Sequence, residues 1–286
     1  MTDRYGALFA RLRAAGEGAF VPFVMLGDPD PESSLRIAGA LVSAGADALE
    51  LGIPFSDPIA DRPVIQGAAN RALAAGTGTG ACFKLLARLR REHPDLPIGL
   101  LVYANLVVSR TAERFYREAA AAGVDSVLIA DLPVAESRPF REAAEAAGIA
   151  PVLIAPPNAG DATLQAIARA ARGYTYVVTR EGVTGADRYF RRDPTQLIAR
   201  LVDSGAPPPL LGFGISTAEQ VRAGLRMGAA GVIVGSALVG VIDRHRGAPD
   251  ALLRAVGDFA AGLKAATRAD AGRAGPAGQP AIRQAQ

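Results

Sequence analysis

The feature that most constrains the fold is a repeated alternation of short apolar runs with longer amphipathic segments along the chain. Several amphipathic segments end at a Gly, which is a common C-terminal signal of a helix. Eight runs have the length and composition of buried strands: residues 19–25, 47–51, 98–103, 125–130, 150–155, 174–179, 208–213 and 230–235. Eight strand–helix units are the number that closes a (β/α)₈ barrel. A doubly wound sheet rarely contains so many units without an added domain, so the pattern predicts an α/β fold, a single TIM barrel.

The length and composition agree with one such domain. The chain has 286 residues, of which 50% are hydrophobic and 21% charged, and this composition provides a large core. We expect the barrel, with an extra N-terminal helix, to occupy residues 1–268. Residues 269–286, rich in Ala, Gly and Gln, are expected to form a disordered tail.

Several sequence features indicate a cytoplasmic protein that does not enter a membrane. The N-terminal segment has scattered charges and lacks the apolar stretch of a signal peptide. The longest apolar run, residues 229–242, is too short to cross a bilayer. The single cysteine, Cys82, excludes an intramolecular disulfide and fits a reducing compartment.

The charge distribution argues against a nucleic-acid-binding protein. The net charge is +3 and the isoelectric point is near 9.3, but Lys and Arg are spread through the helical segments, and aromatic residues make up only 6% of the chain. Nucleic-acid binding usually needs a clustered basic face. A small anionic substrate is the better prediction.

Two glycine-rich segments follow the last two predicted strands. These are GFGIS, from Gly212 to Ser216, and GSALV, from Gly235 to Val239. Glycine lets backbone approach a phosphate closely, and the helix that follows contributes free N–H groups and a positive dipole. The hydroxyl groups of Ser216 and Ser236 can donate further hydrogen bonds. One such loop alone would be read as a tight turn, but two after consecutive final strands predict a phosphorylated substrate.

The distribution of reactive side chains narrows the chemistry. Neither lysine ends a predicted strand, which disfavours a Schiff-base enzyme. The two histidines are also far from strand ends, so we expect no metal site. The groups with acid–base capacity that remain near strand ends are Glu50, Asp61, Tyr103, Asp131 and Tyr176.

The strongest catalytic candidates are the carboxylates of Glu50 and Asp61. The alternation in ALEL points Glu50 into the barrel or toward its mouth. A buried carboxylate is costly unless it is paired or acts in catalysis, and burial moves its pKa toward useful acid–base values. A paired structural role for Glu50 and a capping or solvated role for Asp61 are the alternatives.

The motif LELGIPFSDPIAD, which contains both carboxylates, resembles the signature of the tryptophan synthase α subunit family. The similarity continues through FVPFVMLGDP, IGLLVYANLV, GVDSVLIADLPV, APPNA, REGVTGA, GFGIS and GSA, and covers residues 1 to about 268. The resemblance implies the retro-aldol cleavage of indole-3-glycerol phosphate to indole and glyceraldehyde 3-phosphate. Glu50 would be the general acid–base, and Asp61 would bind the indole N–H.

The resemblance also implies binding roles for residues that match the family motifs. The phosphate would lie on Gly185, Gly212, Gly214, Gly235 and Ser236. The indole pocket would contain Phe23, Leu101, Leu128, Tyr176, Phe213 and Ile233, several of which could equally be ordinary barrel filling. Tyr103 would lie near Glu50, and Thr184 would belong to a lid that closes onto Asp61.

A partner protein is implied by the same resemblance. Residues Pro54, Asp57, Pro58 and Asn105 match positions at which the family contacts its β subunit in an α₂β₂ complex, although exposed residues of these types need no partner. No cofactor is expected on this chain, because pyridoxal phosphate belongs to the β subunit.

The chain departs from the family pattern at three places near the predicted site. Arg62 replaces a Gly after Asp61, Met25 replaces a Thr, and the segment 188–193 is unusually basic and aromatic. If Arg62 keeps the backbone of a Gly with positive φ, it is strained, and its guanidinium could pair with Asp61; an Arg turned to solvent is the alternative. Strain or pairing would slow turnover, and Arg62→Gly with Met25→Thr would then raise kcat.

Three functions therefore stay open. The first is the α subunit of tryptophan synthase, acting in tryptophan biosynthesis beside a β subunit. The second is a paralogous stand-alone lyase that acts on indole-3-glycerol phosphate or on a modified phosphorylated substrate. The third is a catalytically impaired subunit that only activates the β partner.

Overall fold

The eight predicted strands form one closed parallel barrel in the order β1-β2-β3-β4-β5-β6-β7-β8, which confirms the predicted fold class. The computed structural model describes residues 3–178, 193–212 and 214–268. The strands are β1 (Ala19–Met25), β2 (Leu49–Gly52), β3 (Ile98–Val102), β4 (Ser126–Ile129), β5 (Ala150–Ala155), β6 (Thr175–Val178), β7 (Pro209–Gly212) and β8 (Gly231–Val234). Seven of them lie within the predicted apolar runs, and β2 extends one residue beyond its predicted run of 47–51, to Gly52.

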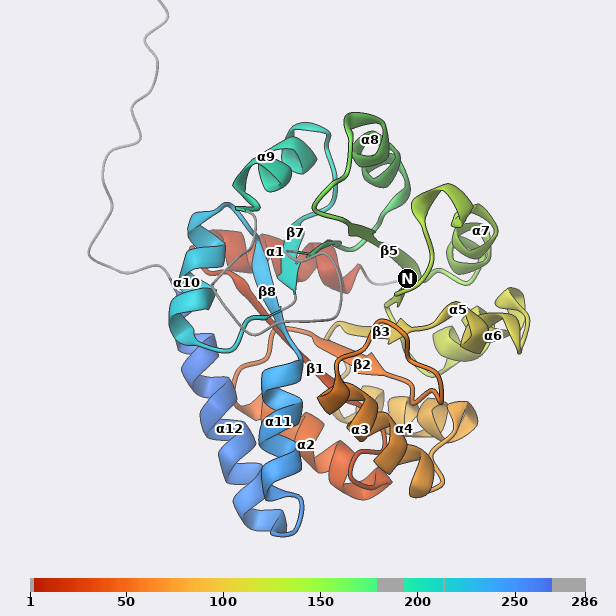
Figure 1. Cartoon of the computed structure of the whole chain (residues 1–286), viewed down its shortest axis with the longest axis vertical. Coiled ribbons are helices and arrows are strands. Elements are labelled where there is room, and N and C mark those ends of the chain that lie inside the picture. Colours follow the sequence, from red (N-terminus) through yellow and green to blue (C-terminus); the bar gives the residue numbers. More distant parts are fainter. Residues whose placement is uncertain (1–2, 179–192, 213, 269–286) are drawn as a thin grey trace, which may run out of the picture.

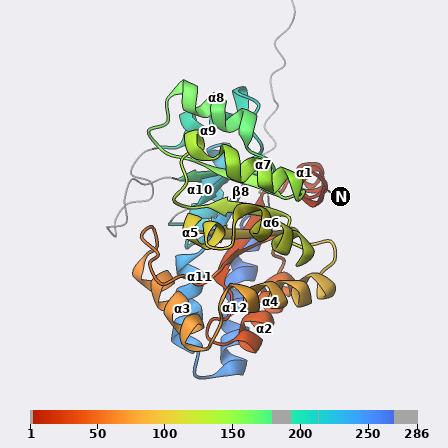
Figure 2. The same cartoon turned by 90° about the vertical axis from the view of Figure 1, so that its right-hand side faces the viewer.

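Helices surround the barrel as a continuous outer layer (Figure 1, Figure 2). They are α1 (Arg4–Ala15), α2 (Pro31–Ser43), α3 (Pro63–Ala74), α4 (Thr79–Glu92), α5 (Ala104–Val108), α6 (Ala112–Ala121), the 3₁₀ turn η1 (Val134–Glu136), α7 (Arg138–Ala146), α8 (Asp161–Ala170), α9 (Thr195–Asp203), α10 (Ala218–Arg226), α11 (Ser236–His245) and α12 (Pro249–Ala265). The first of them, α1, is the predicted extra N-terminal helix.

Side chains alternate between two apolar layers along each strand. In β2, Leu49 and Leu51 belong to the outer cluster between strands and helices. Ala48 belongs to the inner cluster, which fills the barrel together with residues such as Val21, Leu210 and Ile233. Because side chains alternate along a strand, Glu50 faces the interior with Ala48.

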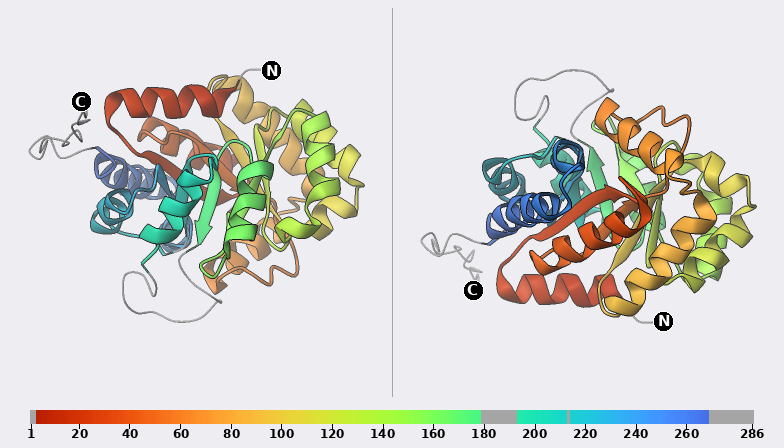
Figure 3. Two further views of the ribbon diagram at one scale, coloured as in Figure 1. Left: turned by 90° about the horizontal axis from the view of Figure 1, so that it is seen from above. Right: turned by 90° about the horizontal axis from the view of Figure 1, so that it is seen from below.

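The end of the barrel at which the strands begin is closed by α1 and by two aspartates, the buried Asp47 and the half-buried Asp125. Asp47 accepts hydrogen bonds from the backbone N–H of Phe20 (2.9 Å), from Arg11 (3.0 Å) and from Lys264 (2.8 Å). Asp125 accepts hydrogen bonds from Arg4, Arg90 and the backbone N–H of Ile98 at 2.6–2.8 Å. In both views of Figure 3, α1 lies along one side of the molecule. These contacts join α1 to the starts of the strands, so they hold the bottom of the barrel together.

Some predictions fall on residues outside the described ranges, namely Thr184, Gly185, Phe213, most of the 188–193 segment and the tail 269–286. Among the described helices, none is long and apolar enough to span a bilayer. The described residues also contain no group of three or more His, Cys, Asp or Glu side chains that could hold a metal ion.

Candidate active site at the barrel mouth

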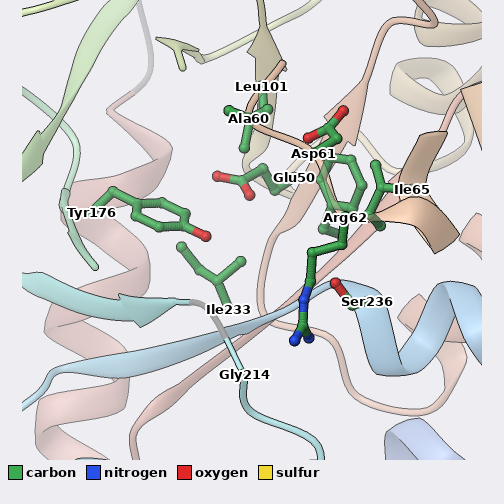
Figure 4. A pocket seen from close by; sticks show the side chains of 12 residues that line it. Glu50, Ala60, Asp61, Arg62, Ile65, Leu101, Tyr176, Gly214, Ile233 and Ser236 are labelled. Carbon is green, nitrogen blue, oxygen red and sulfur yellow. The ribbon is translucent and has the colours of Figure 1, made fainter. Parts of the chain in front are cut away.

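A cavity lies among the carboxyl ends of the strands, at the end of the barrel opposite α1. It encloses about 490 Å³ of space, part of it open to solvent. Its lining residues come from strands and loops that are far apart in the sequence (Figure 4), and they are Phe23, Glu50, Ala60, Asp61, Arg62, Ile65, Leu101, Tyr176, Gly214, Ile233, Gly235 and Ser236. Nine of the residues predicted for catalysis or substrate binding are therefore brought together here. Ala60 and Ile65 were not anticipated, because their apolar letters carry no chemical signal.

Glu50 is a buried carboxyl group at the floor of this cavity. Its backbone pairs with Phe23 of β1 and Gly99 of β3. Its Oε1 accepts a hydrogen bond of 2.7 Å from the hydroxyl of Tyr174, whereas its Oε2 is buried without a hydrogen-bond partner among the described residues. Burial raises the pKa of Glu50 to about 7, and the Tyr174 bond opposes that rise. A carboxyl group with a pKa near neutrality can both donate and accept a proton.

Tyr174 is a site residue that sequence reasoning missed. Its ring lies 5.5 Å from the ring of Tyr5, and Tyr5 in turn bonds the hydroxyl of Ser126 at 2.8 Å. These groups lie beneath Glu50, on the side away from the cavity. The available signal was spacing, since Tyr174 is two residues before the inward-facing Tyr176.

The bond from Tyr174 should control the pKa of Glu50. A hydroxyl that donates to a carboxylate stabilises its ionised form, so Tyr174→Phe should raise the pKa of Glu50 above the wild-type value. Titration of the ¹³C-labelled glutamate carboxyl by NMR measures this directly. Tyr5→Phe is the matched control, because the Tyr5 hydroxyl bonds Ser126 and not Glu50. An unchanged pKa in Tyr174→Phe would contradict the assignment of this hydrogen bond.

Asp61 is the second acid of the cavity, and it comes from the loop that leads into α3. The side-chain amide of Gln66 donates to the backbone carbonyl of Asp61 at 2.9 Å. Burial raises the pKa of Asp61 to about 6, and a hydrogen bond from Tyr103 opposes the rise. The Tyr103 hydroxyl also accepts from the backbone N–H of Ala60 at 3.1 Å. Tyr103 therefore supports Asp61, whereas the prediction placed it beside Glu50.

Three other predicted groups lie near the cavity without lining it. Leu128 is a buried member of the inner cluster. Gly212 faces the ring of Tyr176 so closely that a Cβ at this position would collide with the ring. Asp131 is exposed, and its carboxylate accepts from the N–H of Ala104 at the start of α5 (2.8 Å). Asp131 is thus a helix cap and not a cavity acid.

The end of the cavity away from Asp61 is formed by glycine backbone and by the start of α11. Gly214 has a φ of 93°, a backbone conformation that residues other than Gly rarely adopt. Gly235 precedes α11, and no side chain of the described residues caps that helix. Ser216, in contrast, donates its N–H and its hydroxyl to Gln220 at 2.7 and 3.0 Å. Ser236 lines the cavity. Of the two glycine-rich loops, the one between β8 and α11 is therefore a better anion site than the one between β7 and α10.

The structure contradicts two of the possibilities considered for Arg62, a strained backbone and a pair with Asp61. Its φ of −71° and ψ of 156° are ordinary extended values, so the backbone is not strained. Among the described residues, Arg62 forms no ion pair, and its guanidinium points away from the Asp61 carboxylate (Figure 4). The premise for a kcat increase in Arg62→Gly is therefore wrong. Met25 does not line the cavity; it is buried, and a Cβ on Gly52 would lie 2.9 Å from its Sδ.

The predicted partner residues lie around the rim of the same mouth. Asp57 and Asn105 are exposed, Pro58 is half-buried, and Pro54 is buried. Beside them, two large apolar side chains face solvent: Ile59 is 74% exposed and Val108 is 58% exposed. The rim segments contact each other, because the rings of Phe55 and Tyr103 lie 5.5 Å apart.

Comparisons with known proteins agree with the geometry. A sequence profile described as "Tryptophan synthase alpha chain" matches residues 9–268. A relative of that name from Shewanella oneidensis is 58% identical over 265 residues, which cover 93% of this chain and 95% of the relative. Another from Klebsiella pneumoniae is 56% identical over 266 residues, covering 93% and 99%.

Solved structures show the same similarity. Tryptophan synthase subunit alpha from Legionella pneumophila has a TM-score of 0.83 and 30% identity, covering 93% of this chain and 99% of that one. A chain in a structure of the tryptophan synthase α2β2 complex from Pyrococcus furiosus has a TM-score of 0.76 and 35% identity, covering 87% and 98%. The matched region coincides with the barrel that carries the cavity.

Proposed function

The chain belongs to the tryptophan synthase alpha chain family, and from this membership we propose that it is a lyase that cleaves indole-3-glycerol phosphate to indole and glyceraldehyde 3-phosphate in tryptophan biosynthesis. The observation that carries the proposal is the joint presence, in one cavity, of two acids with different environments and a helix N-terminus that no described side chain caps. These groups suit the two ends of a substrate with an indole ring and a phosphate.

Glu50 performs both proton transfers in the proposed reaction. As a neutral acid it protonates C3 of the indole ring, and the ring becomes an indolenine with positive charge on its nitrogen. The resulting carboxylate then takes the proton of the glycerol hydroxyl next to the ring. The bond between the ring and the glycerol carbon breaks, its electron pair restores the indole, and the hydroxyl carbon becomes the aldehyde. A pKa of about 7 suits a group that must act in both directions.

Asp61 accepts the indole N–H and stabilises the charge that develops on the nitrogen. Its pKa of about 6 leaves it largely ionised at neutral pH, whereas Glu50 remains substantially protonated. When the environments of two carboxyl groups separate their pKa values, one group can act as the proton donor while the other remains a carboxylate anion. The apolar wall of Phe23, Leu101 and Ile233 would hold the ring between them.

The phosphate is proposed to bind the loop between β8 and α11. The N–H groups at the start of α11 and the hydroxyl of Ser236 can donate to it, and the helix dipole favours an anion there. Gly214 and Gly235 allow the backbone to approach. Gly185 and Gly212 keep their implied roles as further phosphate contacts, Phe213 as an indole contact and Thr184 as a lid residue.

We further propose that the rim around Asp57 and Asn105 binds a β subunit that carries pyridoxal phosphate, and that the protein is cytoplasmic. The exposed apolar side chains of Ile59 and Val108 support a protein contact at this rim, because large apolar groups that face solvent together often mark interfaces. Asn105 and Val108 are three residues apart on α5, so they lie on one face of that helix.

Val108→Glu should weaken the complex with the β subunit by at least about tenfold, because a charge would be buried against apolar surface. Titration of β subunit by calorimetry measures the effect. Val202→Glu is the matched control, since Val202 is 55% exposed on α9 and Val108 is 58% exposed. Equal affinities of both variants for the β subunit would place the interface elsewhere.

The experiment that tests the function is the release of indole from indole-3-glycerol phosphate by the purified full chain, with and without the β subunit of its source. Cleavage that the β subunit stimulates supports the α-subunit role. Cleavage without any detectable complex supports the stand-alone lyase. Stimulation of the β reaction without cleavage supports the impaired activating subunit.

A further inference from the structure

Arg62 provides the only cationic side chain among the described residues that line the cavity. The other charged lining residues are the carboxyl groups Glu50 and Asp61, and an ionised carboxylate repels a phosphate dianion. Arg62 is half-buried and has no ion-pair partner in the described part of the chain. A guanidinium at a cavity wall without a protein anion beside it is available to an anionic ligand.

The backbone directs Arg62 away from Asp61. Residue 62 is extended and is the N-cap of α3, where its carbonyl accepts from the N–H groups of Ile65 (2.9 Å) and Gln66 (3.0 Å). Pro63 follows as the first helical residue. Asp61 ends a turn, in which its N–H donates to the carbonyl of Pro58 at 3.0 Å, and the two side chains point to different sides (Figure 4). In Figure 4 the Asp61 carboxylate lies on the far side of Glu50 from Gly214, and the Arg62 guanidinium extends toward Ser236 and Gly214.

The packing of α3 on α11 fixes Arg62 beside the start of α11. The two helices lie side by side (Figure 1), and Arg71 of α3 pairs with Asp243 of α11 at 2.9 Å. Arg71 and Asp243 are each about two turns beyond the start of their helices. Since both helices run in the same direction along the barrel, this pair brings the residues at their starts, Arg62 and Ser236, to the same level.

We propose that Arg62 binds the phosphate of the substrate, so that this chain holds the anion with a guanidinium as well as with backbone N–H groups. The inference rests on the proposed function, which places the phosphate at the start of α11. It makes Arg62 a specificity-determining residue, since the side chain discriminates a phosphorylated ligand from its unphosphorylated fragment. It also gives a role to a position at which the family pattern has a glycine.

The phosphate takes no part in bond cleavage, so Arg62 contributes equally to the bound substrate and to the transition state. Such uniform binding lowers KM without raising kcat. Arg62→Gln should therefore raise KM for indole-3-glycerol phosphate and leave kcat undiminished. Gln is compatible with the extended backbone at this position, and Arg62 makes no side-chain cap bond that the variant would lose.

The test is calorimetric titration of the full chain with glycerol 3-phosphate and, separately, with indole. Arg62→Gln should weaken glycerol 3-phosphate binding by about 10- to 100-fold, the range expected for hydrogen bonds to a charged group, and leave indole binding unchanged. Arg62→Lys should retain part of the affinity. Arg117→Gln, on the exposed face of α6, removes the same charge away from the cavity and should bind both ligands like the parent.

Glycerol 3-phosphate binding by Arg62→Gln that equals the parent's would overturn the inference. So would an equal loss of affinity for indole and for glycerol 3-phosphate, or a parent that does not bind glycerol 3-phosphate. Failure of the proposed function has a different signature, because the parent would then not cleave indole-3-glycerol phosphate. In that case, a selective loss of glycerol 3-phosphate binding in Arg62→Gln still assigns Arg62 to the phosphate of another substrate.

Discussion

Glu50→Gln should lower kcat for indole-3-glycerol phosphate cleavage by about 10²- to 10⁴-fold, the usual contribution of a general acid–base. The amide keeps the size of the side chain and can still accept the hydrogen bond from Tyr174, but it cannot transfer a proton. Indole release by the purified variant measures the loss. Turnover at the wild-type rate would show that another group moves the proton.

The stability of Glu50→Gln shows whether a loss of activity in this variant comes from unfolding. The pKa of Glu50 in the folded state, about 7, is raised above its ordinary value of 4.5. The stability contributed by neutral Glu50 is therefore complete below pH 4.5 and is lost as the pH rises through 7. At pH 8 to 9, Glu50→Gln should be more stable to denaturant than the wild type, by roughly 3 kcal/mol for a fully buried site. An inactive variant that is also more stable cannot owe its inactivity to unfolding.

Asp61→Asn should lower kcat/KM by about 10²- to 10³-fold, as expected for the loss of one electrostatic contact to a developing charge. Asn keeps the shape of the side chain and can still accept the indole N–H, but it has no negative charge to offset the indolenine. Steady-state kinetics on the chain alone measures this loss. Asp131→Asn is the matched control, because Asp131 caps α5 outside the cavity.

The pH dependence separates the two acids. The proposed reaction needs ionised Asp61 and protonated Glu50, so kcat/KM of the wild type should fall below about pH 6 and above about pH 7. The apparent pKa values of the acidic and basic limbs of this profile belong to the pair of carboxyl groups and not to either residue alone. Asp61→Asn should lose the acidic limb and keep the basic one. An acidic limb that persists in Asp61→Asn would assign it to another group.

The barrel could be predicted because its signal is repeated. Each apolar run is buried on both faces of a parallel sheet, so its composition marks it as a strand wherever it begins. Glu50 could be predicted as a site residue for a related reason. A carboxylate at an inward position of such a strand costs free energy to bury, so it is expected to be paired or to act in catalysis. The two acids and the glycine loops could therefore be predicted as site residues from the sequence alone.

The errors about Arg62 and the omission of Tyr174 have a different origin. The backbone of residue 62 is set by the first turn of α3, and the family glycine was a poor guide to its φ. Tyr174 looks like any aromatic residue beside a buried strand, and only the position of β6, which begins at the next residue, brings its hydroxyl to Glu50 across the barrel. Contacts across the barrel are not encoded in local pattern, so these residues needed the folded structure.

The separation of the hydrogen-bonded aspartates at the bottom of the barrel from the acids at its mouth has a genetic consequence. Substitutions at Asp47 or Asp125 remove the hydrogen bonds that the backbone N–H groups of Phe20 and Ile98 donate, so they should appear as temperature-sensitive alleles whose surviving protein has normal specific activity. Substitutions at Glu50 or Asp61 should appear instead as tryptophan auxotrophs with normal protein levels at every temperature. Substitutions that change the stability of this chain and substitutions that change its activity therefore lie at opposite ends of the barrel.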